Sequence, residues 1–168
     1  LGGEAIANGA NVAKFDQVEA MVKQAMDKWG RVDILVNNAG ILRDKSFAKM
    51  DIADFRLVMD VHVMGAVHCT KAVWPVMTAQ KYGRIVMTTS SSGLYGNFGQ
   101  SNYGAAKMAL VGLMQTLSIE GDKHNIRVNC LNPVFNPDTG LAAEFAGGPV
   151  DEARRAKFLA TIPLGRFS

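Results

Sequence analysis

Tyr103 and Lys107 are the residues of this sequence best suited to proton chemistry. They lie four residues apart at the start of a predicted helix, so both side chains belong to one helix face, one turn apart. Ser90 lies thirteen residues before Tyr103, in a hydroxyl-rich segment that follows the short apolar run 85–87. That run is typical of a buried strand. We expect the hydroxyl at the strand end to face the phenol and the amine of this helix. Such a set of side chains is typical of a site that transfers protons.

Two further polar motifs also follow predicted strands. Asn37-Asn38-Ala39-Gly40 follows the apolar run 34–36, and Asn132-Pro133-Val134 follows the run 128–131. Strands that alternate with helices favour crossover connections and a parallel sheet. The carboxyl ends of parallel strands meet at one edge, where open α/β sheets bind ligands. We therefore expect all three motifs to contribute to one site.

Three predicted helices position these strand ends. The first begins at Asp16, as its N-cap, and ends before Gly30. Two longer helices are expected over residues 51–79 and 102–123, and both carry apolar residues on two faces. One face of each can pack on the sheet, and the other favours contact with a second subunit. Residues 4–8 are interpreted as a short strand.

Composition excludes several classes of function. The 168 residues suit one domain, and 48% hydrophobic and 20% charged residues are typical of a globular protein. The net charge of +3 comes without a basic run, so we expect neither a nucleic-acid nor a membrane partner. Cys69 and Cys130 suit reduced core thiols, which favours a cytoplasmic location. His68 and His124 have no ligand partners at useful spacing, so no metal site is expected.

The spacing of Ser90, Tyr103 and Lys107, together with Asn37-Asn38-Ala39-Gly40, resembles the signature of the short-chain dehydrogenase/reductase family. The segments ILRDKSFAKM, VHVMG and KYGRIVMTTSSSGLYGNFGQSNYGAAK resemble, more narrowly, the 3-hydroxyacyl-CoA dehydrogenase unit of peroxisomal-type multifunctional enzymes. This resemblance covers roughly residues 11–133. It implies a Rossmann-like, doubly wound parallel α/β sheet in a single domain over residues 1–168. Against the family pattern, we expect the first βαβ unit and the last strand to be missing, as in a chain cut at both ends.

The resemblance also implies the chemistry. Hydride would pass between NAD and a hydroxyl or carbonyl carbon of a 3-hydroxyacyl or 3-oxoacyl thioester, with NADP left open. Tyr103 would act as acid or base, with its pKa lowered by Lys107 together with an oxidised nicotinamide ring, and Lys107 would also hold ribose hydroxyls. Ser90 would stabilise the substrate oxygen. His62 stands where the broad family has an Asn that holds a relay water, and the alternative is a core histidine with its hydrogen bonds satisfied.

The remaining cofactor contacts are also implied by the resemblance. Asn11 and Val12 stand where the family contacts adenine, although a plain loop Asn is an equal alternative for the first. The tail resembles the 3-oxoacyl carrier-protein reductase branch, and its Thr139 lies one residue further from Pro133 than the family pattern has it. The full set expected to bind the cofactor is Asn11, Val12, Asn37, Ala39, Gly40, Tyr103, Lys107, Pro133, Val134 and Thr139.

Two functions remain open at this point. The first is a NAD(P)-dependent oxidoreductase that assembles as a homodimer or homotetramer, cytoplasmic or, in a eukaryote, peroxisomal. The second is a catalytically silent fragment that acts only as a folded or partner-bound module. The second stays open because the family's Gly-rich phosphate loop has no counterpart in these 168 residues.

Overall fold

The structure is a computed structural model, and it describes residues 2–133, 136–139 and 142–167. The chain divides into two compact units, the first ending at Asn132 and the second beginning at Pro133. Each unit is described by itself below. The prediction of a single domain stays a prediction.

A parallel sheet of three strands forms the first unit. The strands are β1 (Ile34–Asn37), β2 (Gly83–Thr88) and β3 (Ile126–Leu131), in the spatial order β1-β2-β3. Leu35 pairs with Ile85, and Ile85 pairs with Val128. Short β-branched runs form these strands because such side chains pack well on a pleated, half-buried surface. The predicted α/β fold with a parallel sheet is confirmed.

Four helices of the first unit lie close to their predicted positions. α1 (Phe15–Trp29) ends at Gly30, whose φ of 73° is the left-handed conformation that closes many helices. The interpretation of Asp16 as N-cap is wrong, because the helix already begins at Phe15 and Asp16 lies in its first turn, where a carboxylate complements the helix dipole. The other three are α2 (Ile52–Met59), α3 (Gly65–Gln80) and α5 (Ser101–Gly121).

The long helix expected over residues 51–79 is confirmed in extent but contains a local change of winding. Asp51 caps its start, where the carboxylate accepts a hydrogen bond from the backbone N–H of Ala53 at 2.7 Å. Between α2 and α3 lies a π-helical segment, η2 (Asp60–Met64). The apolar stripe continues through this segment, so periodicity alone could not reveal it.

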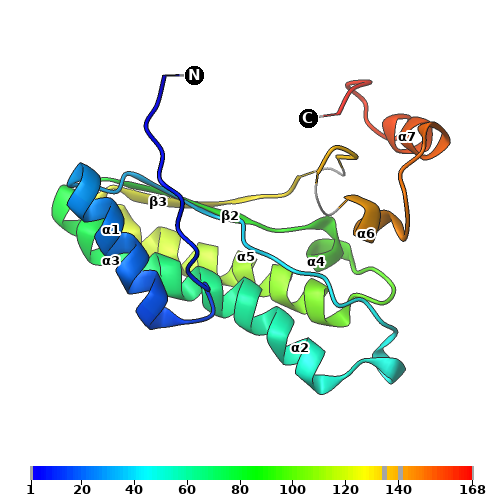
Figure 1. The fold of residues 1–168 in the computed structure, drawn as a ribbon, viewed down its shortest axis with the longest axis horizontal. Coiled ribbons are helices and arrows are strands. Elements are labelled where there is room, and N and C mark those ends of the chain that lie inside the picture. The colour runs from blue at the N-terminus through cyan, green and yellow to red at the C-terminus, as the bar shows by residue number, and fades with distance from the viewer. Residues whose placement is uncertain (1, 134–135, 140–141, 168) are drawn as a thin grey trace. The chain divides into compact units, whose positions relative to one another are not determined.

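The strand expected at residues 4–8 is not formed. Within residues 2–10 the chain runs as an irregular arm beside α1 (Figure 1), to which it is tied by a hydrogen bond from Asn8 to Gln24 and an ion pair of Glu4 with Lys28. A strand requires a neighbouring backbone to accept its hydrogen bonds, and this segment finds side chains of a helix instead. The short apolar run of residues 5–7 therefore does not decide its conformation.

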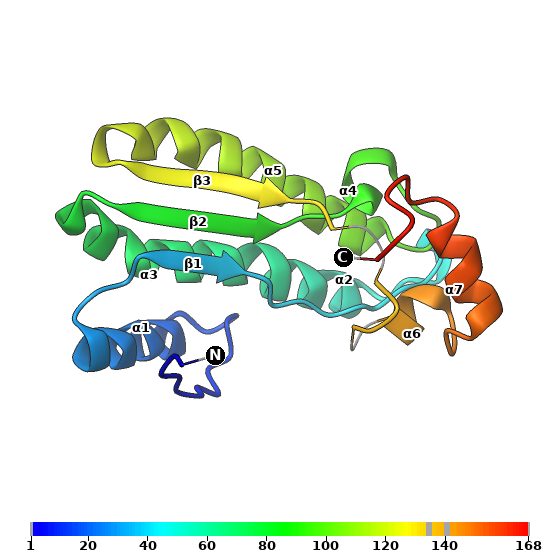
Figure 2. The same cartoon turned by 90° about the horizontal axis from the view of Figure 1, so that it is seen from above.

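The core lies between the sheet and the helices that cover one of its faces. Seen from above, α3 and α5 lie behind the three strands (Figure 2). On the opposite face Ile34 and Val36 remain 64% and 58% exposed. Burial of each large apolar side chain contributes about 1.5–3 kcal/mol. The buried cluster comprises Ala66, Val73, Met77, Ile85, Met87, Leu110, Ile126 and Val128.

Shorter elements complete the two units. In the first unit they are the 3₁₀ turn η1 (Phe47–Lys49), the short helix α4 (Ser91–Tyr95) and the 3₁₀ turn η3 (Asp122–His124). The second unit contains α6 (Ala142–Ala146) and α7 (Glu152–Leu159). α7 begins at Asp151, whose side chain accepts a hydrogen bond from the backbone N–H of Arg154 at 2.8 Å.

Candidate functional site

Ser90 lies where the chain leaves β2 and enters α4. Its backbone is extended, and its hydroxyl accepts a hydrogen bond of 3.3 Å from the backbone N–H of Ser92. Serine is favoured at such a position because its oxygen satisfies a free N–H at the helix start. The same hydroxyl also hydrogen-bonds the phenol of Tyr103. The strand end therefore places the Ser90 hydroxyl beside the first turn of α5.

Tyr103 and Lys107 lie on one face of α5, as their spacing predicts, and both are buried. The ammonium Nζ of Lys107 lies 5.3 Å from the centroid of the Tyr103 ring and donates a 2.6 Å hydrogen bond to the carbonyl oxygen of Thr88. A second hydrogen bond joins the same two segments: the Thr89 hydroxyl donates to the carbonyl oxygen of Lys107 at 3.0 Å. The structure thus brings Ser90, Tyr103 and Lys107 together at the end of β2.

The pKa values of this group are set chiefly by burial. Burial lowers the pKa of Lys107 to about 8, although nearby Cys130 acts in the opposite direction. The pKa of Tyr103 is raised, first by burial and further by the carboxylate of Asp44, while the hydrogen bond from Ser90 lowers it. That Lys107 and an oxidised nicotinamide ring together lower the pKa of Tyr103 stays a prediction. The Lys107 ammonium donates to the Thr88 carbonyl and lies near the face of the Tyr103 ring.

His62 lies in η2 and contacts Tyr103 edge to face, with ring centroids 5.3 Å apart. Its Nε2 lies 3.0 Å from the backbone nitrogen and 2.9 Å from the backbone oxygen of Ile41, so the ring is held against the loop after β1. Burial, and then the charge of Lys107, lower the pKa of His62 to about 4. The imidazole is therefore neutral at pH 7. Its buried Nδ1 has no hydrogen-bond partner among the described residues.

The motif of residues 37–40 holds the loop after β1 in place. The Asn37 side chain donates to the hydroxyl of Thr70 on α3 at 3.1 Å, and the Asn38 side chain accepts from the hydroxyl of Thr88 at 2.9 Å. A Cβ atom on Gly40 would lie 2.6 Å from Cε1 of His62. Ala39 is exposed. These contacts support the structural part of the expectation for this motif, and its contact with a cofactor stays a prediction.

Asn11 and Val12 form a turn that is tied to helices rather than to the group around Tyr103. The side-chain oxygen of Asn11 accepts from the backbone N–H of Ala13 at 2.9 Å, and its backbone N–H donates to Gln17 at 2.8 Å. His68 on α3 hydrogen-bonds the carbonyl oxygen of Val12 at 2.9 Å. The loop interpretation accounts for these contacts of Asn11, and an adenine contact stays a prediction.

The remaining predicted cofactor residues belong to the second unit. Thr139 donates its hydroxyl proton to the carbonyl oxygen of Asn136 at 3.1 Å, within a local turn. Pro133 begins that unit, and Val134 lies outside the described residues. Their role at the site therefore stays a prediction.

Sequence reasoning missed three polar residues next to the site. Gln100 and Asn102 are almost completely buried directly before Tyr103, and Asp44 accepts a hydrogen bond from Gln100 at 2.6 Å. They lie in loops or at a helix start, where no hydrophobic periodicity marks an inward-facing position. The only available signal was the presence of two amides directly before the tyrosine.

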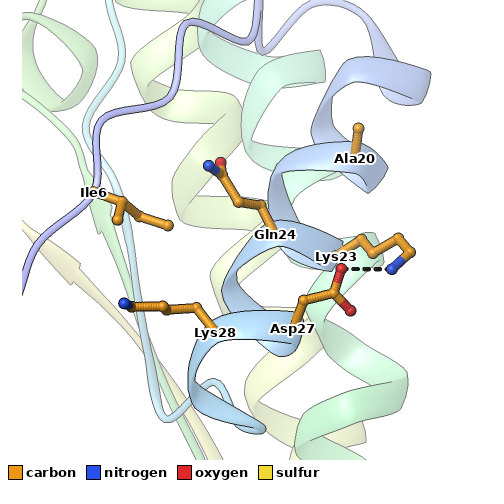
Figure 3. Close-up of a pocket in the computed structure, with 6 residues that line it drawn as sticks. All are labelled: Ile6, Ala20, Lys23, Gln24, Asp27 and Lys28. Atoms are coloured by element: carbon orange, nitrogen blue, oxygen red, sulfur yellow. Dashed lines mark hydrogen bonds and ion pairs between the residues drawn. The ribbon is translucent and has the colours of Figure 1, made fainter.

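An open pocket of about 480 Å³ lies elsewhere, between the N-terminal arm and α1. Ile6 on the arm faces Gln24 and Lys28 across it, and Lys23 pairs with Asp27 at its side (Figure 3). None of the predicted site residues lines it. Among the described residues, no cluster of three or more potential metal ligands is found. No helix in the described part of the chain is long and apolar enough to cross a membrane.

Comparison with known proteins agrees with this geometry. The family model "short chain dehydrogenase" matches residues 1–146. The peroxisomal hydratase-dehydrogenase-epimerase of Saccharomyces cerevisiae is 53% identical over 132 residues, which are 76% of this chain and 15% of that protein. The protein of the same name from Neurospora crassa is 46% identical over all 168 residues, which cover 18% of its length. The match therefore extends through the second unit.

A solved structure shows the same relationship. Full-length peroxisomal multifunctional enzyme type 2 from Drosophila melanogaster superposes with a TM-score of 0.68 and 46% sequence identity, over 80% of this chain and 23% of that one. The chain thus spans less than a quarter of each of these relatives. The family model, the sequence identities and the shared fold agree with the Ser, Tyr and Lys gathered at the sheet edge, and this chain belongs to the short-chain dehydrogenase family of oxidoreductases.

Proposed function

We propose that this chain transfers a hydride between NAD(H) and the carbon that bears the oxygen in a 3-hydroxyacyl or 3-oxoacyl thioester. The observation that carries the proposal is the meeting of Ser90, Tyr103 and Lys107 at the carboxyl end of β2. The relatives named hydratase-dehydrogenase-epimerase support the substrate class. NADP remains an alternative to NAD, because the residue that would select between them has no counterpart in the sequence.

The chain's own residues account for the proton half of the reaction. In the oxidising direction Tyr103, as the phenolate, accepts the proton of the substrate hydroxyl while the carbon that bears this hydroxyl loses its hydride. In the reducing direction the Tyr103 phenol gives the proton to the alkoxide that forms on the substrate. The Ser90 hydroxyl donates a hydrogen bond to the same oxygen and stabilises its developing negative charge. The raised pKa of Tyr103 means that the phenol is protonated at neutral pH and is prepared to act as an acid.

A nicotinamide cofactor fits the donors that surround Tyr103. When bound, the nicotinamide ring supplies or accepts the hydride. The buried Lys107 ammonium can donate to ribose hydroxyls, and the buried Nδ1 of His62 has hydrogen-bonding capacity to hold a water molecule. Asn37, Ala39 and Gly40, in the motif after β1, would also contact the cofactor. Asn11 and Val12 would contact its adenine ring, and Pro133, Val134 and Thr139 stay predicted cofactor contacts.

Assembly is a second part of the proposal. α2 and α5, with η2 between α2 and α3, carry exposed apolar side chains, which support a homodimer or homotetramer. These side chains are Ile52 and Leu57 of α2, Met64 of η2, and Met108 and Ile119 of α5. The names of the relatives support a peroxisomal location if the source is a eukaryote. A cytoplasmic location otherwise stays a prediction. Sedimentation of the chain at micromolar concentration tests the assembly directly.

The catalytic proposal is tested by reduction of a short 3-oxoacyl-CoA with NADH at millimolar concentration, followed by product analysis. We expect slow turnover, because no Gly-rich loop in these 168 residues is available to hold the pyrophosphate. Tyr103→Phe should abolish that turnover. Tyr95→Phe is the matched control, because Tyr95 is 84% exposed and lies at the end of the short helix α4.

The outcomes separate the two functions. Turnover that survives in Tyr103→Phe would remove Tyr103 from the chemistry. Turnover absent from the unsubstituted chain at saturating NADH would favour a catalytically silent, partner-bound module. Micromolar NADH affinity with rapid turnover would contradict the expectation of weak binding.

A further inference from the structure

Two loops that flank Tyr103 are cross-linked by hydrogen bonds. The first is segment 42–45, which follows the motif of residues 37–40, and the second is segment 97–102, which leads into α5. The backbone N–H of Lys45 donates to the carbonyl oxygen of Gly99 at 2.9 Å, and the Asn102 side chain donates to the carbonyl oxygen of Arg43 at 2.9 Å. The shortest cross-link is the 2.6 Å hydrogen bond from Gln100 Nε2 to Asp44 Oδ2.

The Gln100 end of this cross-link is buried. Gln100 is 4% exposed and Asn102 is fully buried. The side-chain oxygen of Gln100 accepts from Asn97 at 3.0 Å, and that of Asn102 accepts from the backbone N–H of Tyr103 at 2.7 Å. A buried amide must find partners, and a bond to a carboxylate is stronger than one between neutral groups.

Gln100 occupies the N-cap position of α5, yet its side chain makes no cap. The amide turns away from the helix start and donates to Asp44 instead. The conformation of the first turn of α5, which carries Tyr103, therefore depends on a residue 56 positions earlier in the chain. Asp44 is the only charged side chain among these cross-links in the described residues, and the others are amides and backbone groups.

The carboxylate also acts on Tyr103 through space. Among the described residues, the polar or titratable groups that act on Tyr103 include Asp44 from the loop, Lys107 from α5, His62 from η2 and Ser90 at the start of α4. Asp44 raises the pKa of Tyr103 and Ser90 lowers it, while His62 is neutral at pH 7. Asp44 is exposed, so water and salt reach its charge.

We propose that Asp44 is a positioning residue of the site: through its hydrogen bond with Gln100 it fixes the first turn of α5, which carries Tyr103. The charge of the same carboxylate favours the protonated phenol, and this effect is the charge half of the proposal. This inference rests on the proposed function for its relevance to catalysis. It assigns Asp44 no contact with the substrate. As a consequence, the Tyr103 phenol is prepared to donate a proton to a carbonyl substrate. In the direction of alcohol oxidation, the phenol must first lose that proton.

Two variants separate the effect of the Asp44 charge from the effect of its cross-link to Gln100. Asp44→Asn removes the charge but keeps an oxygen that accepts from Gln100. Gln100→Met removes the cross-link but keeps the charge. Asp54→Asn is the matched control, because Asp54 pairs with the neighbouring Arg43 at 3.8 Å and is not among the groups that shift the pKa of Tyr103.

The charge is measured by NMR titration of the chain labelled at tyrosine Cζ. The chain has three tyrosines, and Tyr103→Phe identifies the resonance of interest. Asp44→Asn should lower the pKa of Tyr103, the difference should shrink in about 1 M salt, and Asp54→Asn should leave the pKa unchanged. An unchanged or raised pKa of Tyr103 in Asp44→Asn would overturn the charge half of the proposal.

The cross-link is measured by amide hydrogen exchange of residues 97–104. Gln100→Met should accelerate exchange there about tenfold or more, which is the effect of losing one hydrogen bond to a charged group, while Asp44→Asn should change it much less because the Asn oxygen still accepts from Gln100. Equal protection in all variants would overturn the positioning half. Neither readout requires turnover, so these results stand even if the Tyr103→Phe assay removes the proposed function.

Discussion

The imidazole of His62 occupies the space in which residue 40 would place a Cβ atom, with Cε1 at 2.6 Å from that position. Gly40 is therefore a packing requirement of His62, whatever the motif of residues 37–40 contributes to a cofactor. The ring is buried and its Nε2 lies within hydrogen-bonding distance of the Ile41 backbone, so it has little room to move aside. The glycine and the histidine should behave as a coupled pair.

Gly40→Ala should destabilise the chain by about 1–3 kcal/mol, because the added methyl group overpacks a buried contact. Denaturant unfolding measures this change. Gly112→Ala is the matched control: a Cβ there meets nothing within 4 Å in the middle of α5, so we expect a gain of about 0.5–1 kcal/mol from helix propensity. In a His62→Ala background the cost of Gly40→Ala should largely disappear. An equal cost in both backgrounds would show that the imidazole is not the obstacle.

His62 should also make stability depend on pH. Its pKa falls from 6.5 in the unfolded chain to about 4 in the folded one, so between these values the unfolded state binds more protons. The stability that neutral His62 contributes is complete above pH 6.5 and is lost as pH falls toward 4, by up to about 3 kcal/mol.

The measurement is the unfolding free energy of the chain and of His62→Asn from pH 7 to pH 4. The Asn amide can still bond Ile41 but does not titrate. The difference in stability between the two proteins should therefore shrink as the pH falls. His68 and His124 are present in both proteins, so any contribution that they make cancels in the difference between the two stabilities. Parallel curves over this range would mean that the pKa of His62 is the same in the folded and unfolded states, so that burial does not lower it.

The sequence predicted the three strands, the long helices and the meeting of Ser90, Tyr103 and Lys107, because hydrophobic periodicity and spacing determine these features locally. It did not predict the contacts that decide the chemistry of the site. The direction of the Lys107 ammonium depends on the Thr88 carbonyl, and the burial of Gln100 depends on Asp44, far away in the chain. The strand predicted over residues 4–8 is absent for the same reason, because a local sequence pattern does not indicate whether a partner strand lies beside it.

Lys107 should titrate near pH 8 in the folded chain, well below its usual value of 10.5. Burial disfavours its charged form, so the amine is half neutral at that pH. Nitrogen-15 NMR of the lysine side chains measures this directly, and Lys107→Met identifies the signal by its loss. A Lys107 signal that titrates with the exposed lysines would show that water reaches the ammonium and that the group around Tyr103 is less enclosed than the structure indicates.

The outer edge of β1 should make the chain prone to self-association. β1 is an edge strand of the three-stranded sheet, and its residues Ile34 and Val36 are exposed on the sheet face that the helices of the first unit leave uncovered. An exposed apolar edge offers unpaired backbone groups and hydrophobic surface to a second chain. Val36→Lys should reduce light scattering on heating, because a charge on an edge strand opposes pairing. Leu35→Lys is the contrasting variant: Leu35 packs against the buried cluster, so this change should unfold the chain instead. Scattering that is unchanged by Val36→Lys would place the association surface elsewhere, with the exposed apolar side chains of α2 and α5 as the next region to substitute.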